Sequence, residues 1–371
     1  MKKRLTATGL VCLLFMGVVS CRQDQTWKGS IETRDGVTVV KNPKDPPYKK
    51  SPVLLEEELT LGGSRSDEMA LLSRPFCLVV DDGGSIYVLD IQEGNIKKFG
   101  PDGKFLMTIG HKGQGPGELQ GPLSIQITSQ KELLVDCVIS SRLVYFSQDG
   151  VFLRETALTK IPRALIVADA QGDFICQYPE SGQIFKEVLA KFGSDQQRLF
   201  QIAEVDPRYS EIYFPFAPGI IFNVTPESHI IWAVTDRYEI MVTDPQGRLI
   251  KRISRDYVPV EVTEADKQNL IKRQGPPDQG AKIPAVYSPL QSEFPTSDEA
   301  GRIFIKTYLR AADGVSFFFD AFDSSGRYVA RIPLKQVRRV PLVWKKDKLY
   351  TIEEDEGGFN LVKRYKVTWR G

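Results

Sequence analysis

Residues Phe76–Gly110 read FCLVVDDGGSIYVLDIQEGNIKKFGPDGKFLMTIG. Short apolar runs alternate in this stretch with turns rich in Gly, Asp and Pro, such as Asp81–Gly84 and Gly100–Gly103. Short apolar runs bounded by these turn-forming residues are typical of antiparallel strands. The stretch therefore predicts four consecutive β-strands.

The same pattern recurs at a nearly constant offset. The positions that match 47 residues apart are Pro75 and Pro122, Phe99 and Phe146, Gly103 and Gly150, and Phe105 and Phe152, while Asp90 and Asp136 lie 46 apart. A fixed offset across four strands indicates one repeated supersecondary unit, and a repeated four-stranded unit is a propeller blade. We therefore predict an all-β chain that forms a β-propeller of four-stranded blades.

Weaker copies follow near Ile161, Gly219, Gly301 and Lys348, which makes six blades. The sixth copy lacks its outer strand. Glu58–Gly62 resemble Leu106–Gly110 in type and place, so we expect residues 54–61 to complete the last blade. Closing the ring in this way removes the open sheet edges that invite aggregation.

The first two copies resemble a known family of repeats. Gly113–Leu119 (GQGPGEL), Pro122 after it and Ile86–Asp90 (IYVLD) in the copy before closely resemble the NHL-type repeat. The resemblance is clear over residues 73–156 and faint beyond, because later copies lack the Gly-x-Gly-Pro-Gly loop. It implies a propeller that recognises its ligand with one face of the disc.

One insert, residues 256–286, interrupts the repeat. Thr263 stands at a predicted N-cap with Asp266 at N3, and Gly275-Pro276-Pro277 would end the helix. We expect a short helix near 262–274 that covers one face of the ring, with or without a ligand beneath it.

The first residues read as an export signal. A basic start, Lys2-Lys3-Arg4, precedes the apolar stretch Leu10–Val19, which is shorter than the roughly 20 residues of a membrane span. Val18–Cys21 resembles the bacterial lipobox, in which the Cys thiol is acylated. An ordinary signal peptide with an incidental Cys is the alternative.

We therefore expect three parts along the chain. Residues 1–20 are a signal peptide, residues 21–50 hold a lipidated Cys21 and a tether with a small hairpin at Val37–Val40, and residues 51–371 form the propeller. The residue after Cys21 is Arg22 and not Asp. This pattern resembles that of lipoproteins that are delivered to an outer membrane.

Charge and cysteine content limit the partners. Residues 1–20 hold three basic residues, so their removal changes the formal net charge from +2 to −1. Without a basic excess, nucleic acid is not the expected partner. Cys77, Cys137 and Cys176 are expected as buried thiols, with one disulfide as the alternative.

Few residues point to catalysis. The mature chain holds only His111 and His229, in non-equivalent places, so we expect neither a metal nor a cofactor. The acidic run Glu353–Glu356 lacks the Asp-x-Asp spacing of a calcium loop and is better explained as a solvated turn. Asp90 and Asp136 are expected to accept backbone N–H groups in their turns.

Side chains just before the inner strands would point to the mouth of the channel. These are Arg74, Gln120 and Arg163, and the aromatic residues expected nearby are Tyr213, Phe214 and Phe216. Aromatic platforms with Arg donors suit a peptide or glycan; alternatively, these residues only fill the funnel between blades.

We therefore expect a membrane-anchored binding or scaffold module for a protein, peptide or glycan in the bacterial cell envelope, and a propeller lyase or hydrolase is the alternative.

Overall fold

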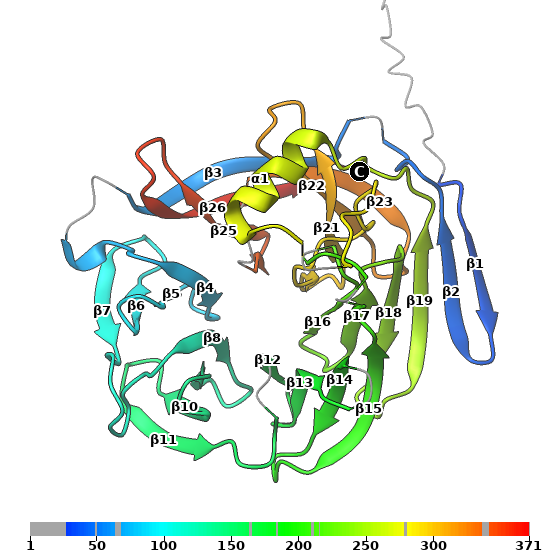
Figure 1. Ribbon diagram of the computed structural model, residues 1–371. Helices are drawn as coiled ribbons and strands as arrows, with labels where there is room; N and C mark the ends of the chain where they lie inside the picture. Colours follow the sequence, from blue (N-terminus) through cyan, green and yellow to red (C-terminus); the bar gives the residue numbers. More distant parts are fainter. Residues whose placement is uncertain are drawn as a thin grey trace, which may run out of the picture.

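Six β-sheets stand around one axis, and within each sheet the strands follow one another from the centre outward (Figure 1). This computed structural model describes residues 27–48, 50–63, 68–162, 165–182, 185–208, 211–214, 216–277, 280–335 and 341–370. The predicted signal peptide, Cys21 and Arg163 lie outside the described residues.

The first three sheets each consist of four sequential antiparallel strands. Blade 1 contains β4 (Pro75–Val80), β5 (Ile86–Asp90), β6 (Asn95–Phe99) and β7 (Phe105–Ile109). Blade 2 contains β8 (Pro122–Ile127), β9 (Leu133–Cys137), β10 (Arg142–Phe146) and β11 (Phe152–Ala157). Blade 3 contains β12 (Leu165–Ala168), β13 (Phe174–Glu180), β14 (Lys186–Phe192) and β15 (Arg198–Val205).

The last three sheets repeat this order, and blades 4 and 6 also take strands from the N-terminal part of the chain. Blade 4 contains β16 (Ile220–Val224), β17 (Ile230–Val234), β18 (Glu239–Thr243) and β19 (Leu249–Arg255). Blade 5 contains β20 (Thr296–Ser297), β21 (Ile303–Arg310), β22 (Phe317–Phe322) and β23 (Tyr328–Leu334). Blade 6 contains β24 (Val343–Lys345), β25 (Lys348–Glu354) and β26 (Asn360–Trp369).

The predicted ring closure is confirmed. Strand β3 (Val53–Gly62) pairs antiparallel with β26 along its length, from Val53 opposite Trp369 to Gly62 opposite Leu361. It therefore supplies the outer strand of blade 6, as expected for residues 54–61, and the all-β fold has six four-stranded blades.

A hairpin extends blade 4 outward. Strands β1 (Ser30–Arg34) and β2 (Val37–Asn42) pair with each other, and β2 runs parallel to β19, so this sheet has six strands. In Figure 1 the hairpin lies outside blade 4, at the rim of the disc. The hairpin is thus an integral part of the propeller and not a part of a free tether.

The apolar core lies between neighbouring blades, because alternate side chains of a strand point to opposite faces of its sheet. In β5, Tyr87 and Leu89 pack with Val135 of blade 2, whereas Ile86 and Val88 pack on the side of blade 6. Each blade is thereby held by its two neighbours.

The helix of the insert is confirmed as α1 (Glu264–Gln274). Thr263 and Asp266 form a capping box, and Gly275 ends the helix with φ +86°. No helix among the described residues is long and apolar enough to cross a bilayer. A short 3-10 helix, η1 (Glu68–Ala70), precedes blade 1.

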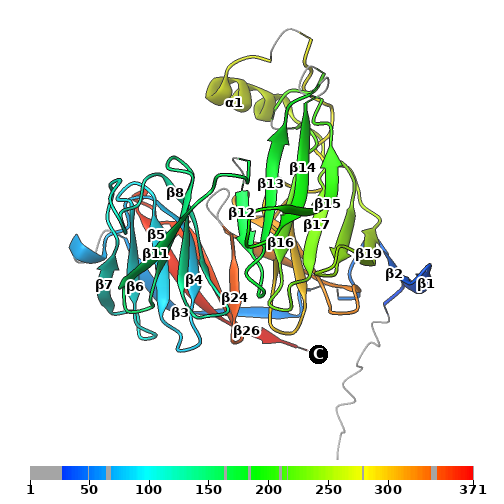
Figure 2. The same cartoon turned by 90° about the horizontal axis from the view of Figure 1, so that it is seen from below.

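The strand order defines two ends of the disc. Since consecutive strands are antiparallel, the connections between blades and the turns between second and third strands lie at one end. We call this end the insert face, because α1 lies on it (Figure 2). The turns after the first and third strands form the opposite face.

The register corrects one match between blades 1 and 2. Asp90 lies opposite Pro75 and Cys137 lies opposite Pro122, so the structural equivalent of Asp90 is Cys137 and not Asp136. Asp90 accepts the N–H groups of Ser73, Arg74, Gln92 and Glu93, as predicted. The prediction for Asp136 is wrong: a shift of one residue turns it to the other face of the sheet, and its Oδ2 is buried without a hydrogen-bond partner.

Candidate functional site

Exposed apolar side chains gather on the insert face. Of the fifteen large hydrophobic side chains that are exposed among the described residues, ten lie there and one, Val151, lies on the opposite face. The ten are Met69, Ile139, Phe185, Phe214, Tyr257, Val258, Ile271, Val286, Val315 and Phe359. This excess makes the insert face the candidate surface for recognition.

Four of these side chains stand at the same position in four different blades. Ile139, Phe185, Val315 and Phe359 lie in the turns between the second and third strands of blades 2, 3, 5 and 6. We call these four residues the apolar tips. Their repetition places exposed apolar side chains on the insert face of four of the six blades.

Aspartate side chains fix two of these turns. Asp313 Oδ1 accepts the N–H groups of Val315 and Ser316 at 3.0 and 2.8 Å. Asp355 Oδ1 likewise accepts the N–H of Phe359 at 2.9 Å. Turns in which an Asp side chain accepts backbone N–H groups are held in one conformation. Val315 and Phe359 therefore lie in ordered turns although their side chains are exposed.

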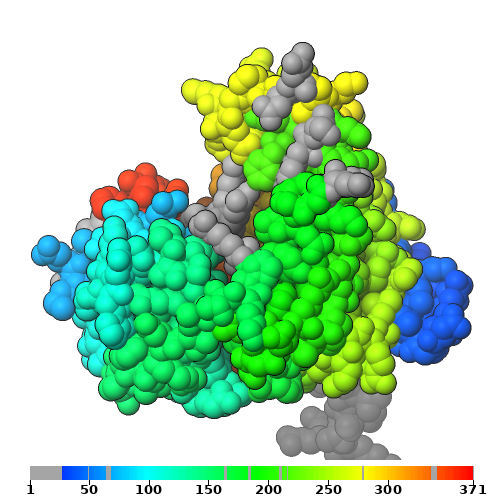
Figure 3. All heavy atoms as spheres, turned by 60° about the horizontal axis from the view of Figure 1, so that its bottom comes forward, coloured from blue at the N-terminus to red at the C-terminus, as the bar shows by residue number. Residues whose placement is uncertain are grey.

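The insert rises above this face on one side. In Figure 3 the insert (yellow) stands high over the ring, above the level of blade 1 (cyan). Tyr213 helps to hold the insert, since its hydroxyl donates to the carbonyl of Gly275 at the end of α1. Phe216 packs against Tyr287 with the ring centroids 5.4 Å apart.

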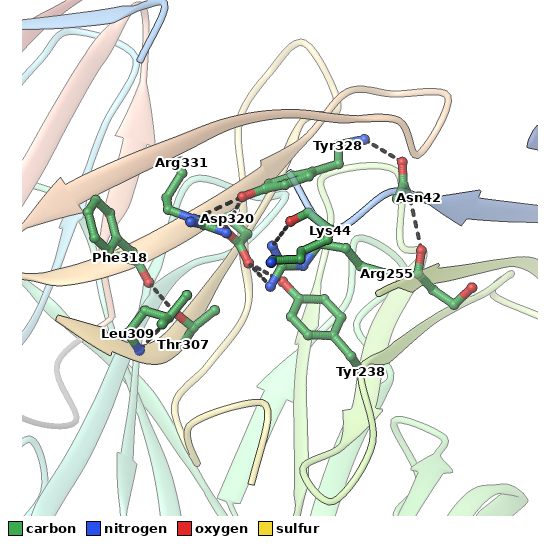
Figure 4. Close-up of polar contacts among 11 residues, drawn as sticks. Asn42, Lys44, Tyr238, Arg255, Thr307, Leu309, Phe318, Asp320, Tyr328 and Arg331 are labelled. Atoms are coloured by element: carbon green, nitrogen blue, oxygen red, sulfur yellow. Dashed lines mark hydrogen bonds and ion pairs between the residues drawn. The ribbon is translucent and has the colours of Figure 1, made fainter. Parts of the chain in front are cut away.

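A buried polar cluster supports the foot of the insert, where blades 4 and 5 meet (Figure 4). Asp320, which has no exposed surface, accepts the hydroxyls of Tyr238 and Tyr328 at 2.5 and 2.6 Å. Arg255 forms an ion pair with Asp320 at 3.4 Å, and its guanidinium lies over both tyrosine rings. Burial, and then the Asp320 carboxylate, raises the pKa of both tyrosines, so they remain hydrogen-bond donors.

A small pocket lies above Arg255. Its walls include Tyr257, Thr307 and the stacked rings of Tyr287 and Tyr308, whose centroids are 4.2 Å apart. The pocket holds about 250 Å³ of empty space. This figure includes open solvent, so the enclosed space lies well below the roughly 300–1,000 Å³ of usual small-molecule sites.

The residues predicted to bind do not form one aromatic platform. Tyr213 and Phe216 are buried under the insert, whereas Phe214 beside them is 45% exposed. Arg74 is exposed and Gln120 is half-buried, both on the insert face before their blades; Arg163 cannot be placed. The sequence contained a signal for the apolar tips that these predictions missed: Val315 and Phe359 are apolar residues that directly follow Gly-containing turns, where polar residues are the rule.

The Gly-x-Gly-Pro-Gly loop has structural contacts. Glu118 accepts the N–H of Gly115 at 2.7 Å and pairs with His111 at 2.9 Å. Arg142 donates to the carbonyls of Gly115 and Glu118. These bonds hold the loop against blade 2.

The residues considered for a metal do not come together. His111 lies on the insert face, and His229 lies in a turn of the opposite face. Among the described residues, no three His, Cys, Asp or Glu side chains form a group that would hold a metal ion. In the acidic run, Glu354 and Glu356 are exposed, but Glu353 is buried and accepts the hydroxyl of Tyr365 at 2.8 Å.

Cys77, Cys137 and Cys176, the cysteines among the described residues, are buried free thiols. Burial raises the pKa of Cys77 to about 12 and that of Cys137 to about 11, and it also raises that of Cys176. A thiol needs its thiolate form to react, so none of the three is activated as a nucleophile.

Comparisons with known proteins agree with the fold. Residues 69–231 match the DUF5128 family, described as a six-bladed β-propeller. No curated protein sequence matches the chain. A protein of Bacteroides fragilis described as exported is 12% identical over 89% of this chain and 99% of its own, with a TM-score of 0.58.

Two further solved structures are similar. A member of the DUF4221 family from Bacteroides vulgatus is 12% identical over 86% of this chain and 99% of its own, with a TM-score of 0.50. Virginiamycin B lyase from Staphylococcus aureus is 10% identical over 85% of this chain and 100% of its own, with a TM-score of 0.47, which is too distant to bear on chemistry. The chain is therefore a six-bladed β-propeller, and at these identities the similarity concerns the fold alone.

Proposed function

We propose that this chain is a lipoprotein of the bacterial cell envelope, anchored through Cys21, and that its insert face binds a protein or peptide partner. The basic start, the apolar stretch and the lipobox-like Val18–Cys21 support export and anchoring. The B. fragilis protein of similar fold is also described as exported. Arg22 after the lipidated Cys favours an outer membrane.

The observation that carries the binding proposal is the unequal exposure of apolar side chains. The insert face exposes ten large apolar side chains, and the opposite face exposes one among the described residues. Protein and peptide partners cover apolar patches of this kind, with aromatic side chains as anchors. A glycan would stack on the exposed Phe and Tyr rings and is the alternative ligand.

The test compares substitutions on the insert face with substitutions away from it. One variant carries Ile139→Ser, Phe185→Ser, Val315→Ser and Phe359→Ser; the control carries Val151→Ser and Leu106→Ser, which are also exposed. Each protein is cross-linked in its native envelope, and the components captured by the wild type are quantified. We expect the variant at the apolar tips to lose roughly tenfold or more of the specific capture, since a buried apolar anchor contributes on the order of 2 kcal/mol.

Two results would contradict the proposal. Equal capture by the tip variant and the wild type would show that the insert face is not the binding surface. If capture persists after the envelope proteins are digested but is lost after the polysaccharide is digested, the ligand is a glycan.

The anchor has its own test. Cys21→Ala removes the sulfur that would carry the lipid. We expect this variant to appear in the soluble envelope fraction, while the wild type fractionates with membranes. A variant that remains membrane-bound would show that no lipid on Cys21 holds the protein.

A further inference from the structure

From Trp27 onward, the N-terminal part of the chain is fixed to the rim of blade 4. The indole N–H of Trp27 donates to Asn42 Oδ1 at 3.0 Å, and the ring packs on the core between blades 4 and 5. Strand β2 pairs with β19 over five residue pairs. Beyond β2, the carbonyl of Lys44 accepts a hydrogen bond from Arg255 at 3.0 Å.

The chain between this fixed point and Cys21 is short. Six peptide units separate Cys21 from Trp27, and they span at most about 20 Å when fully extended. A folded chain of this size has a radius of gyration of about 20 Å, so the disc is wider than this tether is long. An anchor on Cys21 therefore keeps the rim of blade 4 close to the membrane.

Charge distinguishes the rim from the opposite face. Within residues 27–48 and 50, five basic residues (Lys28, Arg34, Lys41, Lys44 and Lys50) outnumber three acidic residues (Glu32, Asp35 and Asp45), which gives a net charge of +2. The eleven turns of the opposite face, by contrast, contain fourteen acidic and eight basic residues, a net charge of −6. These turns are 81–85, 100–104, 128–132, 147–151, 169–173, 193–197, 225–229, 244–248, 298–302, 323–327 and 345–348.

We infer that the β1–β2 hairpin rests on anionic lipid headgroups, so that the disc stands edge-on at the membrane. This inference rests on the proposed lipid anchor at Cys21. Basic segments next to an anchor are attracted to anionic headgroups, whereas a face of net negative charge is repelled by them. In Figures 1 and 2 the hairpin lies at the rim and α1 lies above the ring, so an edge-on disc leaves the insert face open to partners.

Lysine footprinting of the acylated full-length protein tests this orientation. The protein is bound to vesicles of phosphatidylethanolamine and phosphatidylglycerol, acetylated briefly and compared with Cys21→Ala protein in solution. Lys28 and Lys41 report on the hairpin, Lys104 and Lys131 on the opposite face, and Lys272 on α1; all five are exposed. We expect Lys28 and Lys41 to react roughly threefold or more slowly on vesicles, because headgroups shield them, and the other three to be unchanged.

A spacer variant provides the matched control. About 20 Gly/Ser residues inserted between Gln25 and Thr26 add a flexible chain with an end-to-end distance of about 25 Å. We expect this variant to bind the same vesicles while Lys28 and Lys41 lose most of their protection.

The outcomes separate the orientation from the anchor. Wild-type protein that does not float with the vesicles overturns the anchor and the orientation together. Protein that floats with Lys104 and Lys131 protected lies flat on the opposite face, and protein that floats with equal labelling at all five sites has no fixed orientation. Either of these last two results overturns the edge-on disc and leaves the lipid anchor standing.

Discussion

The side-chain oxygen of Asn42 accepts the backbone N–H of Tyr328 at 2.7 Å, joining two residues 286 positions apart. The same oxygen accepts the indole N–H of Trp27, and the amide nitrogen of Asn42 donates to the carbonyls of Ser254 and Gly326. Asn42 is 4% exposed. One buried side chain thus connects the N-terminal hairpin with blades 4 and 5.

Asn42→Ala should destabilise the propeller by about 2–4 kcal/mol, because it leaves several buried polar groups without partners. Lys41→Ala, on the same strand and with a side chain that is 57% exposed, is the control and should cost less than about 0.5 kcal/mol. Urea unfolding followed by tryptophan fluorescence measures both values. Equal losses for the two variants would show that the bonds of Asn42 add little.

The packing of blade 1 on β3 is open to a second test. Gly103 has φ +87°, and a Cβ there would lie 2.6 Å from Leu59 Cδ1 and 2.9 Å from Leu61 Cδ2. Gly172 has φ +84° with nothing within 4 Å of the same position. Both Ala variants should lose about 1 kcal/mol from the positive φ, and Gly103→Ala about 1–2 kcal/mol more from the clash with β3. Thermal unfolding that gives both variants the same loss would argue against tight packing at the ring closure.

Much of this fold follows from local sequence. The turn residues around Gly103 and Gly150 repeat because each blade needs the same backbone there, and Thr263 with Asp266 predicted the start of α1 because a capping box is local. The match of Asp90 with Asp136 failed for a different reason. An offset of 46 instead of 47 changes which face of the sheet a side chain occupies, and only the pairing of Cys137 with Pro122 reveals this.

The candidate site was harder to predict. Tyr213 and Phe216 are aromatic residues near the mouth, but the insert buries them, and a contact such as that between Tyr213 and Gly275 joins segments far apart in the sequence. The apolar tips are single residues in short turns. Their common place on one face emerges only when the blades are arranged in a ring.

Asp136 should make stability depend on pH. Burial raises its pKa to about 7, whereas an unfolded Asp titrates near 3.9. The folded state therefore holds this proton more tightly, so the contribution of Asp136 to stability is greatest below about pH 4 and declines as the pH rises towards 7. Asp136→Asn removes this penalty and should stabilise the protein at pH 8 by about 2–4 kcal/mol, with little difference at pH 4.

Asp90→Asn is the matched control for Asp136→Asn. Asp90 is equally buried, but it accepts several backbone N–H groups, so its amide variant should be destabilised at pH 8. Urea unfolding at pH 4 and pH 8 measures both variants. If Asp136→Asn were no more stable than the wild type at pH 8, the carboxylate would have a partner in solution.

The three thiols should react only when the propeller unfolds. Cys77, Cys137 and Cys176 are each 6% exposed or less, and burial keeps them protonated. In a chain from Arg22 to Gly371, which lacks Cys12 and Cys21, a thiol reagent at pH 8 should therefore add no label within minutes under native conditions and three labels in urea, counted by intact mass. Asp149→Cys is the positive control, since the Asp149 side chain is 91% exposed, and it should be labelled at once. Labelling of Cys137 in the native protein would show that blades 1 and 2 separate without global unfolding, and labelling of Cys176 would show the same for blades 2 and 3.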